Sequence, residues 1–224
     1  MSNKQIVILG DSAFAEIAYE YFTHDSDFEV IGFSVEQKFL HKTSLLGLPV
    51  IPFESLKENI DVKNCGFHAA ITYTQLNRLR PRLINSALRM GLTPVSYISS
   101  RAFIWKNVEI GSHSFIFENN TIQPYVKIGS NVVLWSGNHI GHHSVIEDNV
   151  FIASQAVISG FTTIGKSSFI GVNATISNNV KVGNDNWIGL NATVTKDTQN
   201  NQLFKGSRSE PSPVEAKKFF KVEE

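Results

Sequence analysis

Residues 138–158 read NHIGHHSVIEDNVFIASQAVI, in which an isoleucine occupies every sixth position, at Ile140, Ile146, Ile152 and Ile158. The same spacing continues in both directions, from residue 104 to residue 194, without a slip. All sixteen positions of this register hold Ile, Leu or Val, and thirteen of them hold Ile. Because a fixed period is the sequence signature of a repeat architecture, this register decides the fold of the segment.

The period of six fits neither the apolar stripe of an α-helix nor the simple alternation of an ordinary strand. Four residues after each aliphatic residue stands a small or β-branched residue or an asparagine, and glycine often follows the aliphatic one directly. Glycine and asparagine tolerate the positive φ that tight corners require. We therefore predict a parallel β-helix in which three hexads make one coil and the aliphatic side chains fill a dry axis.

Residues 1–100 follow a different rhythm, in which apolar runs alternate with helical patterns. Strands are predicted over residues 5–9, 28–33, 67–72 and 92–98, and helices over residues 13–22 and 75–90. This alternation is typical of a Rossmann-like α/β half-domain with a parallel sheet. We expect that half-domain over residues 1–100, the β-helix over residues 101–196 and a short C-terminal tail over residues 197–224.

The composition narrows the classes of function. The 224-residue chain has 20 basic and 20 acidic side chains, so it lacks the net charge that attracts nucleic acid or an acidic membrane surface. A single cysteine, Cys65, excludes an intrachain disulfide and a cysteine-based zinc site. The sequence shows neither a secretory signal nor a membrane-spanning run. We expect a cytoplasmic protein with no nucleic-acid partner and no membrane insertion.

The hexad pattern resembles that of the left-handed parallel β-helix acyltransferases. Joined to an N-terminal α/β half that contains Gly47-Leu48-Pro49-Val50, it resembles the hexapeptide-repeat nucleotide-sugar acetyltransferases of the PglD type and the GDP-perosamine N-acetyltransferase type, with sialic-acid O-acetyltransferases as relatives. The resemblance implies an acetyl-CoA-dependent N-acetyltransferase that acts on the amino group of a nucleotide-linked amino-deoxy sugar without a metal. It also implies a homotrimer and a role in the synthesis of lipopolysaccharide or a related glycan. O-acetylation of a sugar or sialic-acid hydroxyl is the alternative.

Three histidines gather in the quoted stretch, and their phase relative to Ile140 places His139, His142 and His143 at outward positions. Histidine changes charge near neutral pH, so it suits the general base that acyl transfer to an amine or hydroxyl needs. The resemblance assigns that base to His142 and places His143 where the family has an acidic residue. Glu147 and Asp148 are the nearest carboxylates that could replace that acid, and both remain candidates.

Gly160 follows His142 by one full coil. A glycine there would let a substrate approach the backbone, and the resemblance implies that its N–H stabilises the oxyanion formed during acyl transfer. Phe151 stands where the family has a second histidine, so we expect it to contact the acyl group or the pantetheine arm. The predicted coenzyme A contacts are His139, Phe151, Gly160, Lys196, Lys205 and Arg208.

The segment Gly10-Asp11-Ser12-Ala13 follows the first predicted strand and opens the first predicted helix. A helix N-terminus with free N–H groups favours phosphate. The segment lacks the second and third glycines of a dinucleotide fingerprint, which argues against NAD. The resemblance implies that these four residues bind the nucleotide diphosphate of the sugar substrate.

Two further classes of function compete with acyl transfer. A zinc site of the γ-carbonic-anhydrase kind would need His113, His139, His142 and His143 to converge across a subunit interface. No pair of histidines at the spacing expected for such a site is recognised among the coils, and the α/β half would be unexplained. A non-enzymatic scaffold is the second competitor, and full activity of a His142→Ala variant would favour it.

Overall fold

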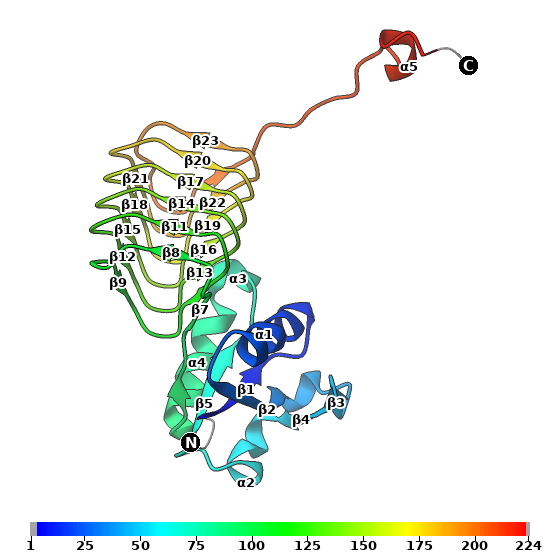
Figure 1. Cartoon of the computed structure of the whole chain (residues 1–224), viewed down its shortest axis with the longest axis vertical. Helices are drawn as coiled ribbons and strands as arrows, with labels where there is room; N and C mark the ends of the chain where they lie inside the picture. Colours follow the sequence, from blue (N-terminus) through cyan, green and yellow to red (C-terminus); the bar gives the residue numbers. More distant parts are fainter. Residues whose placement is uncertain (1–3, 223–224) are drawn as a thin grey trace.

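The computed structural model describes residues 4–222, and Figure 1 shows an α/β domain, a prism of stacked coils and an extended tail. The α/β domain contains β1 (Lys4–Leu9), α1 (Ala13–His24), β2 (Phe28–Val35), η1 (Gln37–Phe39), β3 (Ser44–Leu45), β4 (Leu48–Pro52), η2 (Phe53–Ser55), α2 (Leu56–Asn59), β5 (Cys65–Ala69), α3 (Thr74–Asn77), α4 (Leu79–Met90) and β6 (Thr93–Pro94). Its sheet has the order β3-β4-β2-β1-β5-β6, and all neighbours are parallel except β3 and β4.

Two predicted elements of this domain differ from those observed. Of the helix expected over residues 75–90, only α4 is regular, because Gln75, Leu76 and Asn77 within the short α3 adopt positive φ. The strand expected over residues 92–98 is also divided: β6 joins the α/β sheet, whereas β7 (Tyr97–Ile98) pairs with β10 in the prism. The hydrogen-bonded coils therefore begin before residue 101.

The prism has three faces, each a parallel sheet of two-residue strands. The first face contains β7, β10 (Phe115–Ile116), β13 (Val133–Leu134), β16 (Phe151–Ile152), β19 (Phe169–Ile170), β22 (Trp187–Ile188) and β24 (Leu203–Phe204). The second contains β8 (Phe103–Ile104), β11 (Thr121–Ile122), β14 (His139–Ile140), β17 (Val157–Ile158), β20 (Thr175–Ile176) and β23 (Thr193–Val194). The third contains β9 (Glu109–Ile110), β12 (Lys127–Ile128), β15 (Val145–Ile146), β18 (Thr163–Ile164) and β21 (Lys181–Val182).

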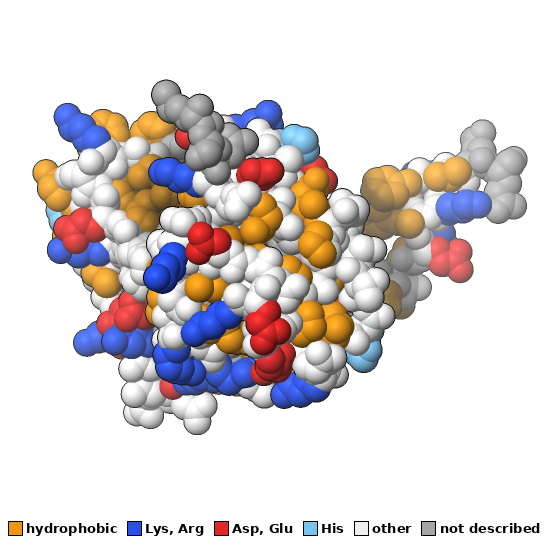
Figure 2. Space-filling view, turned by 90° about the horizontal axis from the view of Figure 1, so that it is seen from below, with side chains coloured by type: hydrophobic (Ala, Val, Ile, Leu, Met, Phe, Trp, Pro, Cys, Tyr) orange, Lys and Arg blue, Asp and Glu red, His pale blue; other side chains and the backbone are white. Residues whose placement is uncertain are grey.

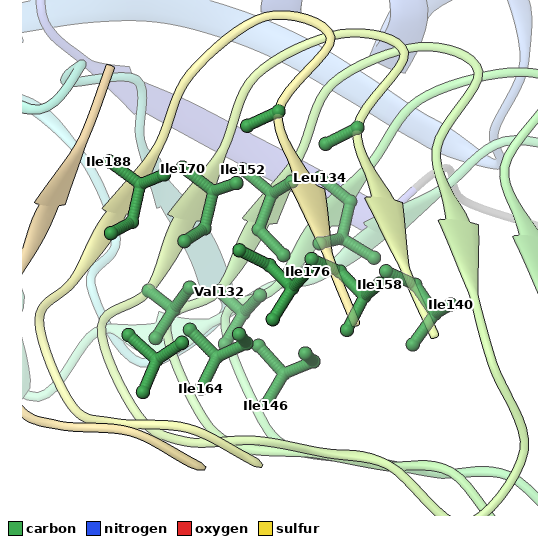
Figure 3. Packing of buried hydrophobic residues seen from close by; sticks show 14 of the residues in the cluster. Val132, Leu134, Ile140, Ile146, Ile152, Ile158, Ile164, Ile170, Ile176 and Ile188 are labelled. Atoms are coloured by element: carbon green, nitrogen blue, oxygen red, sulfur yellow. The ribbon is translucent and has the colours of Figure 1, made fainter. Parts of the chain in front are cut away.

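The second residue of each of these strands points into the prism. Ile140 pairs with Ile158, and Ile158 with Ile176, so each aliphatic side chain stacks on the one a coil away. Figure 3 shows these columns converging from the three faces on a common axis. From Ile116 to Val194 the column is buried throughout, so the dry aliphatic axis predicted from the sequence is confirmed.

From residue 113 to residue 191, each corner between faces places one residue in the left-handed region. Asn119, Asn131, Asn149 and Asn179 have φ of 59°, 59°, 60° and 60°. Asparagine accepts this conformation more readily than most side chains, which explains the abundance of asparagine in the coils.

The α/β domain lies at the end of the prism where the coils begin (Figure 1), and residues of this domain pack against the first face. The outward residues of that face form an apolar column with an aromatic side chain at nearly every step: Tyr97, Phe115, Val133, Phe151, Phe169 and Trp187. Phe14 of α1 packs against Phe115 at 5.5 Å between ring centroids, and Tyr73 packs against Phe169 at 4.6 Å. One apolar cluster therefore joins residues of the α/β sheet, α1 and the prism.

A buried polar cluster lies at the same junction. Arg80 donates from Nε to Asn131 Oδ1 at 2.7 Å and from a terminal nitrogen to Asn131 O at 2.6 Å. The rings of His68 and His113 stack with centroids 4.4 Å apart, and His113 Nε2 accepts the Ala69 N–H at 2.9 Å. Burial lowers the pKa of His68 to about 3 and holds the pKa of His113 well below its usual range. Both imidazoles are therefore neutral near pH 7.

The tail leaves the prism as an extended segment and ends in the short helix α5 (Ala216–Phe219), away from the body of the chain (Figure 1). Within residues 4–222, no helix combines the length and apolar character needed to cross a bilayer. Seen from the end that carries the α/β domain, the surface mixes acidic and basic side chains (Figure 2).

Candidate functional site

His142 and His143 lie on the corner between the second and third faces. The corner begins after β14 and ends at β15, and His143 occupies its left-handed position with φ of 60°. Both side chains are exposed, because the aliphatic register commits Ile140 and Ile146 to the interior and the corner between them turns His142 and His143 outward. The outward orientation predicted for this histidine pair is therefore observed.

Gly160 lies one coil away, directly against the imidazole of His142. A Cβ added to Gly160 would stand 2.9 Å from His142 Cε1 and 3.0 Å from Nε2. Such distances are shorter than a normal carbon contact of about 3.5–4.0 Å. The glycine therefore makes room for the histidine ring itself, which differs from the sequence-based reason that it makes room for a substrate.

The backbone N–H of Gly160 donates to no group among residues 4–222. One coil earlier, the N–H of His142 donates a hydrogen bond to Gln123 Oε1 at 2.9 Å. The residue that corresponds to Gln123 one coil later is Gly141, which has no side chain to do the same for Gly160. The corner thus presents an imidazole nitrogen beside an open amide, two groups that suit an acyl transfer.

His143 is held in a stack of aromatic rings on this corner. Its ring lies 4.6 Å from that of Tyr125 on the preceding coil and 4.7 Å from that of Phe161 on the following coil, nearly parallel to both. Its Nδ1 lies 3.1 Å from the Nδ1 of His142. Sequence reasoning missed Tyr125 and Phe161, although their spacing of eighteen residues either side of His143 was the available signal.

Glu147, predicted as a possible partner of the base, is located elsewhere. It lies on the next corner, between the third and first faces, where its Oε2 accepts the N–H of Lys166 at 3.0 Å. Asp148, on the same corner, pairs with Lys166 Nζ at 3.6 Å and accepts the N–H of Ser130. Neither carboxylate lies beside His142 within the chain. Residues on adjacent coils become neighbours when they are eighteen positions apart, whereas Glu147 and Asp148 are only five and six positions from His142.

Phe151 is also misplaced by the sequence interpretation as a coenzyme A contact. It belongs to the outward column of the first face, is 2% exposed and packs edge-on against Tyr73 at 5.4 Å. The α/β domain therefore covers the ring that was expected to meet the acyl group or the pantetheine arm. His113, invoked for a zinc site, is likewise buried at the domain junction. Among residues 4–222, no three His, Cys, Asp or Glu side chains are grouped to hold a metal ion.

The remaining predicted coenzyme A contacts are distributed along the prism and its tail. His139 lies half-buried on the outward side of β14. Lys196 is exposed and continues the corner column of His142 and Gly160, three coils beyond His142, which is about 14 Å at the usual strand spacing. Lys205 and Arg208 are exposed at the start of the tail.

A second candidate site lies in the α/β domain at the carboxyl ends of β1 and β2. A cavity of about 300 Å³ is lined by Gly10, Asp11 and Ser12 of the predicted loop, together with Ser34 and Glu36. Gly10 has φ of 123°, and a Cβ there would stand 3.0 Å from Ala70 O, so the loop requires a glycine. Ser12 leaves the N-terminus of α1, which begins at Ala13, without a side-chain cap, and such a terminus suits an anion.

Two basic side chains that bind lining residues of this cavity were missed from the sequence. Lys42 Nζ donates to Asp11 O at 2.8 Å and lies 3.7 Å from its carboxylate, so it offsets the negative charge of Asp11 beside the loop. Arg82 makes two hydrogen bonds to the carboxylate of Glu36, at 2.8 and 2.7 Å, and lowers the pKa of Glu36. Both partners are far apart in sequence, and no local motif marks them.

Comparison with known proteins agrees with this architecture. Residues 125–160 match the family model described as bacterial transferase hexapeptide (six repeats). A search of curated protein sequences found no match. The acetyltransferase domain of PglB from Neisseria gonorrhoeae FA1090 superposes with a TM-score of 0.82 at 20% identity, covering 94% of this chain and all of that one.

Two other solved structures share the whole layout. PerB from Caulobacter crescentus, in complex with CoA and GDP-perosamine, matches with a TM-score of 0.77 at 21% identity, covering 89% of this chain and 92% of that one. WeeI from Acinetobacter baumannii AYE matches with a TM-score of 0.68 at 22% identity, covering 88% and 94%. The chain has their fold. The predicted union of a Rossmann-like half-domain with a left-handed parallel β-helix of hexapeptide repeats is confirmed.

Proposed function

We propose that the protein is an acetyl-CoA-dependent N-acetyltransferase that acts on the amino group of a nucleotide-linked amino-deoxy sugar. The observation that carries the proposal is the corner at which the His142 imidazole lies against Gly160, whose N–H is open. This pairing supplies a base and an oxyanion donor within one coil of each other. No covalent intermediate on the protein is required.

The reaction begins with the amine of the sugar facing the thioester carbonyl carbon. As the C–N bond forms, the amine proton passes to Nε2 of His142, and the carbonyl oxygen gains negative charge. The Gly160 N–H donates to that oxygen; a single donor of this kind contributes about 3–4 kcal/mol in comparable sites. The C–S bond then breaks, the sulfur of coenzyme A takes the proton from His142, and the amide product leaves.

The α/β cavity is the proposed site for the nucleotide. Its loop presents the uncapped N-terminus of α1, and Lys42 adds a positive charge beside Asp11, so a diphosphate can be held there. Solved structures of similar fold bind the two substrates: the PglB domain has been determined with acetyl coenzyme A, and PerB with CoA and GDP-perosamine. Both substrates agree with the cytoplasmic location expected from the sequence.

Lys196, Lys205 and Arg208 are the proposed partners of the coenzyme A phosphates. All three are exposed, and Lys196 shares the corner of His142. A pantetheine arm laid along this corner would bring its thioester to Gly160 and its phosphates toward the tail. The half-buried His139 lies on the adjoining second face.

A homotrimer is the proposed assembly. The α/β domain covers the first face, whereas His142 lies on the opposite corner, between the second and third faces. A nucleotide held by the loop at Gly10 is therefore separated from His142 of the same chain by the prism. A neighbouring copy that brings its own α/β domain to this corner would complete the site, and a closed threefold arrangement supplies one such neighbour to each chain.

The test follows release of coenzyme A thiol from acetyl-CoA. A 4-amino-sugar nucleotide should support release, and its 4-hydroxyl counterpart should not. The His142→Ala variant should lose about 10²–10⁴-fold in kcat, the usual contribution of a general base. Release only with the hydroxyl acceptor would instead favour the O-acetyltransferase alternative. Full activity of the His142→Ala variant would refute the mechanism.

A further inference from the structure

His143 stands beside the base at a distance that requires one proton to be shared. Its Nδ1 and that of His142 are 3.1 Å apart, and both groups can act only as donor or acceptor according to tautomer. We propose that His143 is a positioning residue whose bare Nδ1 accepts the Nδ1–H of His142. The proposal rests on the role of His142 as the base and assigns to a neutral imidazole the task that a carboxylate usually performs.

The tautomers follow from the geometry of the site. A neutral imidazole carries one N–H; the ring of His142 lies against Gly160 while its Nδ1 faces His143, so Nε2 is the nitrogen left for the substrate amine. Nε2 must keep its lone pair to accept the amine proton, so the proton of neutral His142 is on Nδ1. The Nδ1 of His143 is then the acceptor, and the proton of His143 is on Nε2. When His142 takes up the substrate proton, its Nδ1–H continues to donate to His143, which stabilises the imidazolium.

The surroundings of His143 hold its ring in the orientation that this acceptor role needs. Tyr125 and Phe161 stack on the two faces of its ring, which fixes the direction of Nδ1. The groups that face it are therefore one phenol, one phenyl ring and His142, and among residues 4–222 no carboxylate is paired with it. Two adjacent imidazoles are not charged together without a large cost. The pair therefore carries a single positive charge once the substrate proton has been taken up.

A carboxylate at this position would act differently. An opposite charge within about 4–6 Å favours the charged form of a histidine by about 1–3 pH units. A neutral imidazole acceptor orients the base without adding an opposite charge beside it. The pH dependence of the reaction therefore reports which kind of acceptor faces His142.

The kinetic test compares three substitutions that all tolerate the left-handed backbone of this position. His143→Asn places an amide oxygen near the Nδ1 position and should retain activity within about threefold with an unchanged acid limb of kcat/KM. His143→Gly removes the acceptor and should lower kcat about 10–100-fold with little change in the KM for acetyl-CoA. His143→Asp should move the acid limb up by about one pH unit.

The matched control introduces the same charge at an equivalent backbone position far from the base. Asn173 has φ of 55° on the corner between the first and second faces, and Asn173→Asp should leave the acid limb in place. An acid limb of His143→Asp that coincides with that of the unaltered protein would show that His143 has a structural role only, and would overturn the proposal.

A second measurement does not depend on catalysis. In the protein labelled with ¹⁵N-histidine, the proposal expects His142 in the Nδ1–H tautomer and His143 in the Nε2–H tautomer at pH 8, with the His142 pattern lost in His143→Gly. The reverse assignment would overturn the proposal even if the enzyme is active. Absence of acetyl transfer with every amino-sugar nucleotide would overturn the proposed function, whereas the tautomers would still decide the hydrogen bond.

Discussion

Replacing Gly160 by alanine tests whether the contact between this glycine and His142 determines activity. The added Cβ would meet the imidazole at 2.9 Å from Cε1, 3.0 Å from Nε2 and 3.3 Å from Nδ1. Because ordinary contacts are about 3.5–4.0 Å, the ring must retreat by roughly 0.5–1 Å. The imidazole is exposed on its outer side, so it can move without disturbing the aliphatic core.

The substitution should therefore lower activity without lowering stability. A displacement of about 1 Å in a reacting group can cost about 10²-fold, so we expect kcat to fall about 10–100-fold. The φ of Gly160 is not in the left-handed region, so alanine fits the backbone and restricts the unfolded chain, which adds about 0.4–1 kcal/mol to the free energy of unfolding. The melting temperature should stay constant or rise slightly.

The assay is thiol release from acetyl-CoA with an amino-sugar nucleotide, paired with thermal unfolding of the same samples. Lys106→Ala is the control, because Lys106 is exposed on the same corner, two coils before His142, and has no proposed role. A Gly160→Ala variant with kcat within twofold of the unaltered protein would refute the reasoning. A loss of several kcal/mol in stability would show that the backbone, and not the ring, gives way.

Three other perturbations address the fold. Ile158→Ala removes a fully buried side chain from the axis and should lower the free energy of unfolding by about 2–5 kcal/mol in urea titrations; a loss below 0.5 kcal/mol would contradict tight packing there. Phe14→Ala should lower the free energy of unfolding by about 3–5 kcal/mol, because Phe14 packs against Phe115 and Trp135 of the prism. If the prism stays folded after the junction is lost, tryptophan fluorescence and circular dichroism should report unfolding transitions at different midpoints. The pKa of His68 is about 3 when folded and about 6.5 when unfolded, so the unfolded chain binds more protons between these values. The contribution of neutral His68 to the free energy of unfolding should be fully present above pH 6.5 and should decrease as the pH falls toward 3. In His68→Phe the free energy of unfolding should depend less on pH over this range. An equal slope in both proteins would show that other groups cause the decrease.

The period of six was enough to predict the prism because each aliphatic residue must occupy the axis. Once the three-sided coil is accepted, the separation of eighteen residues places Gly160 against His142, and this neighbourhood is observed. The same arithmetic, applied to the other outward positions, would have revealed the aromatic column that ends with Phe151, Phe169 and Trp187. An apolar outward column marks a face that another domain covers, and its neglect explains the wrong placement of Phe151.

The contacts that sequence could not supply are those between segments without a common period. Lys42 reaches Asp11 across 31 residues of the α/β domain, and Arg82 reaches Glu36 across 46. These pairs depend on how loops close around the cavity, which no local pattern encodes. The hydrogen bond between His142 and His143 was equally hidden, because adjacent residues on a corner can face each other or diverge according to side-chain rotamers.

The three-sided coil also restricts how such a chain can change its length. Removing six residues before His142 would rotate every later segment by one side of the triangle and would carry the imidazole to the corner that borders the face under the α/β domain. Removing eighteen would only lower the imidazole by one rung, about 4.8 Å, with its direction preserved. Insertions and deletions in this half of the molecule are thus tolerated only in multiples of eighteen residues, because only whole coils keep His142 on its own corner.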